Sequence, residues 1–220
     1  MIESTTGLIL RTRPLTETSL IVHWLTPGLG RLSTVARGAR RAKSPYLGKL
    51  DLFYEAAFTF TRSRRSDLHT LREISLRQTH AQLREQLPRL QQAAYAANLI
   101  ELGTETETPL PAVYQLMHGL LEHLAKHPPQ AQTIFSFELK LLDELGLQPD
   151  LQAGHLKPGT KQVALMLGQG DWADLSRLKP SVAQARELDR FLQGFLIFHL
   201  GRIPKGRVGA VGIGSGSVNE

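Results

Sequence analysis

Four cationic side chains, Arg37, Arg40, Arg41 and Lys43, lie within seven residues of the chain and are separated only by glycine and alanine. Residues 18–50 contain no carboxylate. Guanidinium and ammonium groups on a backbone that a ligand can approach closely are well suited to bind phosphate. The pattern therefore predicts an anion-binding loop. The alternative interpretation is scattered charge on a solvated loop.

Cations elsewhere could extend this basic loop (residues 37–43) into a phosphate-binding surface. Arg11 and Arg13 lie in the first apolar run, and Arg31 lies shortly before the loop. Arg62, Arg64 and Arg65 lie in a polar turn, and Arg202, Lys205 and Arg207 lie near the C-terminus. Exposed aromatic rings could add base stacking. Tyr46, beside Pro45, is the preferred stacking residue, because Trp24 and Tyr54 are in phase with aliphatic neighbours and are expected in a core.

No group of residues has the spacing of a catalytic site. The chain has no Walker A sequence and no nucleophile elbow, and its glycine-rich end is not followed by a helix. Only His123 and His127 have i,i+4 spacing, and they are expected at a polar helix end. Asp171 and Asp174 have no second acidic cluster to complete a two-metal site. We therefore expect a protein that is not an enzyme and needs no cofactor.

Composition limits the class of protein. The chain has 220 residues, no cysteine and a net charge of +6, so disulfides and cysteine-ligated metals are excluded. Residues 1–80 carry +7, residues 81–160 carry −4 and residues 161–220 carry +3. This asymmetry favours an anion-binding first domain. Without a signal peptide or an apolar run of membrane-spanning length, a soluble cytoplasmic protein is expected.

Periodicity predicts β-structure first and helices afterwards. Five short apolar-rich runs favour a small closed barrel: Gly7–Arg13, Ser19–Thr26, Arg31–Ala36, Phe53–Thr61 and Leu68–Arg77. From His80 the period becomes helical, with Pro88 as a kink or break. Residues 147–180 are expected to be irregular, and the glycine-rich end from Gly206 is expected to be a flexible tail.

These patterns predict an α+β multidomain chain. We expect a closed five-stranded barrel over residues 1–79 and a helical domain over 80–146. A small irregular and helical C-terminal region without zinc follows over 147–208, ending in a helix, and residues 209–220 form a flexible tail.

The order of these apolar runs, basic segments and helical segments along the chain is similar to that of the RecO family of bacterial recombination mediators. The resemblance covers about residues 5–208, and Gly30–Ser44 (GRLSTVARGARRAKS) is its most specific part. Four further segments carry it: Gly7–Ser19 (GLILRTRPLTETS), Leu68–Glu73 (LHTLRE), Leu141–Pro149 (LLDELGLQP) and His199–Arg207 (HLGRIPKGR). The family often carries a four-cysteine zinc site, which this chain lacks, and His155 alone cannot replace it.

The resemblance implies that the barrel over residues 1–79 is an OB-fold DNA-binding domain. It also implies a DNA-binding recombination mediator in DNA repair. Such a protein binds single- and double-stranded DNA, anneals complementary strands, and helps RecA to load on strands coated with single-strand-binding protein, with RecR as a partner. It would be cytoplasmic and nucleoid-associated, without a membrane partner. The alternatives are an adaptor for acidic peptides or an RNA-binding OB-fold protein. The expected DNA-binding residues are Arg13, Arg31, Arg37, Arg40, Arg41, Lys43, Tyr46, Arg62, Arg64, Arg65, Arg202, Lys205 and Arg207.

Overall fold

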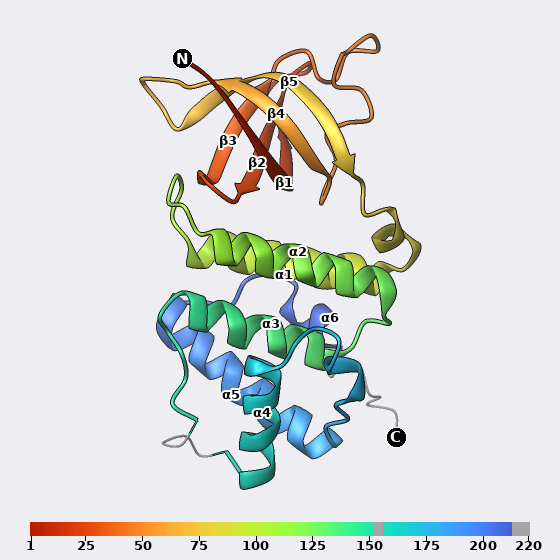
Figure 1. The fold of residues 1–220 in the computed structure, drawn as a ribbon, viewed down its shortest axis with the longest axis vertical. Coiled ribbons are helices and arrows are strands. Elements are labelled where there is room, and N and C mark those ends of the chain that lie inside the picture. Colours follow the sequence, from red (N-terminus) through yellow and green to blue (C-terminus); the bar gives the residue numbers. More distant parts are fainter. Residues whose placement is uncertain (152–155, 213–220) are drawn as a thin grey trace. The chain divides into compact units, whose positions relative to one another are not determined.

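The structure is a computed structural model that describes residues 1–151 and 156–212. The chain divides into two compact units. The first consists of Met1–Ala81 with Thr104–Gln115, and the second of Gln82–Gly103 with Leu116–Glu220. Figure 1 shows a β-barrel in the first unit and helices in the second. The helices expected in a middle domain and in a separate C-terminal region therefore belong to one unit.

Five strands form a closed barrel in the order β1-β2-β3-β5-β4 (Figure 1). All neighbouring pairs are antiparallel except β3 and β5, which close the barrel in parallel through Ser33–Val35 and Leu68–Thr70. This is the strand order of an OB-fold, so the expected barrel is confirmed. The strands are β1 (Ile2–Pro14), β2 (Leu20–Thr26), β3 (Gly30–Ala36), β4 (Glu55–Thr61) and β5 (Leu68–Gln78).

The barrel core contains the residues that alternate in phase along its strands. Trp24 is fully buried and stacks on Phe58 with 4.0 Å between ring centroids. Its Nε1 donates a hydrogen bond of 2.9 Å to Thr34 Oγ1, which satisfies the only polar atom of the indole. The expectation that Trp24 belongs to the core is confirmed, and Tyr54 packs against the same core.

The segment between the first two helices, residues 104–110, packs on the barrel within the first unit. The Arg31 side chain donates to the Thr104 hydroxyl at 2.7 Å and also to the Thr104 carbonyl. The Glu107 amide donates to the Arg31 carbonyl at 2.7 Å. Gly30 (φ +67°) allows this close approach, because a Cβ there would lie 2.0 Å from the Thr108 carbonyl oxygen. This segment is thus part of the barrel unit.

We expect Gly30→Ala to destabilise the barrel unit by about 2 kcal/mol or more, because the methyl group meets backbone and the left-handed φ disfavours alanine. Urea unfolding followed by tryptophan fluorescence would measure the loss. Gly28→Ala is the matched control, since no atom lies within 4 Å of the Cβ that it would add. Equal stability of the two variants would contradict the argued contact.

Six α-helices and two short 3-10 helices follow within the described residues. They are η1 (Ala81–Glu85), α1 (Leu87–Gly103), α2 (Pro111–Lys126), α3 (Ala131–Glu144), α4 (Pro158–Gln169), η2 (Leu175–Arg177), α5 (Val182–Leu200) and α6 (Arg207–Val211). Pro88 is the second residue of α1, where its missing N–H costs no helical hydrogen bond. Pro88 therefore does not interrupt a helix but lies in the first turn of α1.

Two expectations about the C-terminal part were wrong. Residues 147–180 are not irregular throughout, because α4 occupies Pro158–Gln169 and buries Ala164 and Leu167. The region from Gly206 is not a tail throughout either, because α6 is formed and buries Ala210 and Val211. Residues 152–155, including His155, and 213–220 lie outside the described residues.

His123 is a buried histidine on α2, within the helical unit. Its ring stacks on His127 with 4.4 Å between centroids and lies 5.6 Å from the Trp172 ring. Burial, reinforced by the charge of His127, lowers the pKa of His123 from 6.5 to about 4. The imidazole is therefore neutral in the folded protein at neutral pH.

Acidification is expected to destabilise the fold through His123. Between pH 6.5 and about 4 the unfolded chain binds a proton that the folded chain does not, so the free energy of unfolding falls as the pH is lowered through this window. Urea unfolding at several pH values should show a shallower fall for His123→Gln than for the unsubstituted chain. His199→Gln, at an exposed histidine, should keep the full fall. An identical pH profile in His123→Gln would contradict the prediction.

Candidate nucleic-acid interface

The basic loop is an ordered turn that leaves its cations exposed. It begins directly after β3, where the Ala39 amide donates to the Ala36 carbonyl at 3.3 Å. The Arg40 amide donates to the Thr18 carbonyl at 3.0 Å, which ties the loop to the turn between β1 and β2. Gly38, at φ +70°, gives the backbone the left-handed conformation that the turn requires.

The four cations of the basic loop are available to an external anion. The side chains of Arg37, Arg40, Arg41 and Lys43 are all exposed. Arg40 Nη1 donates to the Thr16 carbonyl at 3.3 Å. In the part of the chain that the structure describes, no carboxylate pairs with any of the four. The positive charge of these four side chains is therefore not neutralised by any carboxylate in the described part of the chain.

An open cavity of about 460 Å³ borders the basic loop. Arg37 and Arg41 line it together with the hydroxyl-bearing residues Thr16, Thr18 and Ser19. The Thr16 hydroxyl accepts the Ser19 amide at 3.1 Å, and it can still donate its own proton, for which the described residues show no acceptor. Guanidinium and hydroxyl donors around one hollow are the set that phosphate oxygens require.

The outer face of β1, β2 and β3 continues this cationic surface. Arg11 pairs with His23 across β1 and β2, Arg13 pairs with Ile21, and His23 pairs with Ser33 across β2 and β3. His23 Nδ1 lies 3.0 Å from Ser33 Oγ. Burial, followed by the charges of Arg13, Arg11 and Arg31, lowers the pKa of His23 to about 4.

Sequence reasoning missed His23 and Ser33 as members of this face. The signal was present in the alternation of β2, where His23 lies opposite in phase to the core residues Val22 and Trp24. The cross-strand register decides which cations surround His23, and one strand read alone does not contain that register.

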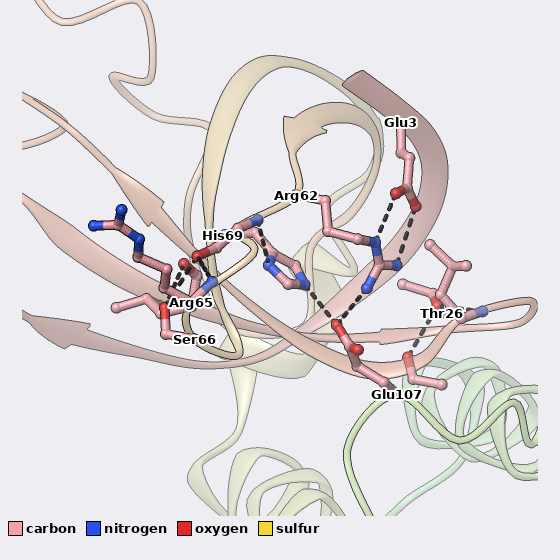
Figure 2. Close-up of polar contacts among 11 residues, drawn as sticks. Glu3, Thr26, Arg62, Arg65, Ser66, His69 and Glu107 are labelled. Carbon is pink, nitrogen blue, oxygen red and sulfur yellow. Dashed lines mark hydrogen bonds and ion pairs between the residues drawn. The ribbon is translucent and has the colours of Figure 1, made fainter. Parts of the chain in front are cut away.

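Arg31 and Arg62 are engaged inside the barrel unit. Figure 2 shows Arg62 between two carboxylates, with Nε 2.6 Å from Glu3 Oε1 and Nη1 2.7 Å from Glu107 Oε1. The hydrogen bond from Arg62 lowers the pKa of Glu3. Glu107 Oε1 also lies 2.6 Å from Nε2 of the buried His69. Arg31 holds Thr104 as described above. Both arginines thus fix the 104–110 segment.

Arg64 and Arg65 form a second exposed basic group, on the turn between β4 and β5. Figure 1 shows this turn and the segment after β3 leaving the barrel on different sides. The Arg65 amide donates to Ser63 Oγ at 3.3 Å, and the Ser63 amide donates to His69 Nδ1 at 3.3 Å (Figure 2). The turn is ordered, but it does not join the basic loop.

Tyr46 does not offer its ring to a ligand, contrary to expectation. It is buried in the barrel core, with 8% of its surface exposed. Its hydroxyl donates toward the carbonyl oxygens of Leu71 and Arg72, at 3.1 and 3.0 Å. The aromatic ring therefore closes the core beneath the basic loop instead of stacking on bases.

The predicted C-terminal basic patch is only partly exposed. Arg202 and Lys205 are exposed, whereas Arg207 is buried with 5% of its surface accessible. Arg207 Nε lies 2.8 Å from Glu138 Oε1, and Arg207 Nη1 lies 2.6 Å from Asp189 Oδ1. Arg207 is therefore a structural ion-pair partner of α3 and α5, and we remove it from the candidate DNA-contacting residues.

The chain does not fit the zinc site that the family resemblance implies. It contains no cysteine. Among the described residues, no group of three or more histidine, aspartate or glutamate side chains could hold a metal ion. A tetrahedral zinc site needs four such ligands. None of the helices in these residues has both the length and the apolar character that crossing a membrane requires.

Comparison with known proteins connects these features to one family. The family model for the recombination protein O N terminal matches residues 1–80, and that for its C terminal matches residues 84–156. The chain is 33% identical over 146 residues to the DNA repair protein RecO of Rhodopirellula baltica and 32% identical over 152 residues to that of Alkaliphilus metalliredigens. It is 30% identical over 151 residues to that of Bacillus pumilus.

These three alignments cover 66%, 69% and 69% of the chain. They cover 54%, 61% and 58% of the relatives, so the chain spans less than two thirds of their lengths. Both halves of the family signature nevertheless occur in order, on the barrel and on the helices that follow it. The chain therefore belongs to the RecO family.

Proposed function

We propose that this chain binds single- and double-stranded DNA through the basic loop and the outer face of β1–β3. The observation that carries the proposal is the group of four exposed cations, unpaired within the described residues, beside a hydroxyl-lined cavity. Contacts of this kind neutralise phosphates and release counterions without reading the sequence of bases. Binding would therefore be strong at low salt and tolerant of sequence.

In this proposal the protein acts as a recombination mediator in DNA repair, in the cytoplasm and at the nucleoid. Three relatives carry the name DNA repair protein RecO, which supports this role. Neutralised strands repel each other less, so complementary strands can anneal on the protein. The protein would cooperate with RecR and with single-strand-binding protein to help RecA load. Counterion release and base pairing supply the free energy, so the chain works without catalysis.

The test is a salt series with the full chain and a fluorescently labelled single strand, followed by anisotropy. If four to six phosphates are contacted, log affinity should fall against log salt with a slope of about −3 to −4. Duplex DNA of equal length should also bind with a salt-dependent affinity. A flat salt response would refute the electrostatic mechanism. Stronger binding of RNA than of DNA of equal length would favour the RNA-binding alternative instead.

A further inference from the structure

A row of aromatic rings lies on the surface of α5, in the helical unit. Phe191 and Phe195 have ring centroids 6.1 Å apart, and Phe195 and His199 have centroids 4.2 Å apart. Phe198 meets His199 edge-on at 4.9 Å. Phe198 is 83% exposed, and Phe191 and Phe195 are partly exposed. We call these four residues the α5 platform.

The core does not require this platform. The buried face of α5 is supplied by Leu188, Leu192 and Leu196, which recur every four residues. The aromatic rings lie outside this leucine row, and the Phe198 ring projects into solvent. A contiguous group of partly and fully exposed rings, unlike a single exposed apolar residue, is a candidate binding surface.

Two exposed cations follow the C-terminal end of α5. Arg202 and Lys205 are exposed and lie four and seven residues after Phe198. The two carboxylates of α5 are already engaged. Glu187 accepts the Thr160 hydroxyl and the Lys157 amide, and Asp189 pairs with Arg207. An anionic ligand at the C-terminal end of α5 therefore has two exposed cations within the next seven residues after Phe198.

The loop that carries these two cations is fixed at several points. The Gly201 amide donates to the Ile197 carbonyl at 2.9 Å, and Asn98 Nδ2 donates to the Lys205 carbonyl at 3.3 Å. Pro204 is buried, and Arg207 is anchored by its ion pairs. Arg202 and Lys205 therefore extend from an ordered backbone.

We propose that the α5 platform stacks the bases of a single DNA strand whose phosphates contact Arg202 and Lys205. The inference rests on the proposed function and adds to it a second, single-strand-specific site. Rings beside cations are the combination that holds unpaired strands, because every base has a stacking face. A protruding ring such as Phe198 suits a flat base, whereas an apolar peptide side chain needs a concave socket.

Among its described residues, the barrel unit offers no exposed aromatic ring for this stacking. Its described tryptophan and phenylalanine side chains are buried, as is Tyr46, and Tyr54 packs against the core. The basic loop and its cavity therefore contact only the backbone, which duplex and single strands share. The α5 platform accepts unpaired bases alone. The two sites together give the chain a preference for single strands and a means of presenting their bases.

The test compares Phe198→Leu with Phe198→Trp in the full chain, using anisotropy with a labelled oligothymidylate, an abasic strand of equal length and a duplex. Leucine keeps an apolar side chain but removes the ring, so single-strand affinity should fall about tenfold while duplex affinity stays unchanged. Tryptophan should keep the affinity for the single strand. The abasic strand should bind the unsubstituted chain as weakly as oligothymidylate binds Phe198→Leu.

Val182→Ala is the matched control, because Val182 is 67% exposed at the opposite end of α5. It should leave every affinity unchanged. Unchanged single-strand affinity in Phe198→Leu, with salt-dependent binding by the unsubstituted chain, would refute the platform and leave the proposed function intact. Absence of all DNA binding by the unsubstituted chain would refute both. If sedimentation shows that Phe198→Leu alters self-association while DNA affinity is kept, the platform is an interface between copies and the proposal is wrong.

Discussion

Replacing Arg37, Arg40, Arg41 and Lys43 together by alanine is expected to weaken single-strand binding about 100-fold at 0.2 M salt. The expectation follows from the loss of four phosphate contacts, each of which contributes about 0.7 to the slope of log affinity against log salt. The slope itself should decrease by nearly 3, and the two proteins should converge in affinity as the salt approaches 1 M. Anisotropy of a labelled strand across a salt series measures both quantities.

This experiment needs a control that separates the effect of the protein's total charge on affinity from the effect of direct contacts made by the basic loop. The matched control removes four exposed cations from the helical unit, at Lys126, Lys157, Arg177 and Lys179, and so changes the net charge equally. If contact at the basic loop matters, this control should keep most of the affinity and nearly the full slope. Equal losses in the two variants would mean that long-range attraction, and not the basic loop, supplies the binding.

The variant should remain folded, because its four side chains are exposed and the contacts that order the loop come from the backbone. Loss of the Arg40 hydrogen bond to the Thr16 carbonyl removes one exposed contact. The cavity beside the loop should consequently persist with Thr16, Thr18 and Ser19 in place. Unfolding in urea would check that the affinity change does not reflect a loss of structure.

The barrel could be predicted from the sequence because its signals are local. The alternation of Val22 and Trp24, and that of Phe58 and Phe60, identifies inward positions within single strands. The exposure of the basic loop also followed from local charge density. Closure was predicted from the number and length of the runs. The strand order was not predicted, since the parallel contact of β3 with β5 joins residues about 35 positions apart.

The mistaken residues are those whose environment depends on distant partners. Tyr46 is buried because the carbonyl oxygens of Leu71 and Arg72 lie over it, and those residues follow 25 and 26 positions later. Arg62 is held by Glu107, 45 positions away. Both residues were placed on the surface because of their neighbours in the chain, the basic loop for Tyr46 and a polar turn for Arg62. Neighbours in the chain contain no information about tertiary contacts.

In the helical unit, α4 and α6 were not predicted. The start of α4 at Lys157-Pro158-Gly159 resembles a loop, although proline is favoured in a first helical turn. Gly206 and Gly209 likewise suggested a tail, yet α6 forms because Ala210 and Val211 are buried. Packing against the rest of the unit overrides weak local propensity in both helices.

Arg207→Met is expected to reduce the free energy of unfolding of the helical unit by about 3–5 kcal/mol. Glu138 is completely buried, and the Arg207 guanidinium meets its two oxygens at 2.8 and 3.0 Å. Removing the arginine leaves a carboxylate in the core with only the Tyr95 hydroxyl as a donor among the contacts described. Urea unfolding followed by circular dichroism would measure the loss. Arg202→Ala, at an exposed site, should be nearly neutral.

The stability lost in Arg207→Met should depend on pH, and the loss should become smaller as the pH falls. Burial raises the pKa of Glu138, and Arg207 opposes this rise. Without the arginine the pKa rises further, so the folded variant takes up a proton that its unfolded chain does not bind near neutral pH. Lowering the pH from 7 toward 5 should therefore recover part of the lost stability of Arg207→Met. A deficit that stays constant over this range would mean that lost packing, and not an unpaired carboxylate, is the cause.

A double variant separates charge from shape. Glu138→Gln combined with Arg207→Met removes both charges and keeps an acceptor for the Tyr95 hydroxyl, so it should be more stable at pH 7 than Arg207→Met alone. Hydrogen exchange at the Ala210 and Gly212 amides, which donate within α6, should accelerate in the single variant and slow again in the double variant. Unchanged exchange in Arg207→Met would show that α6 is held by its buried apolar residues without the ion pair.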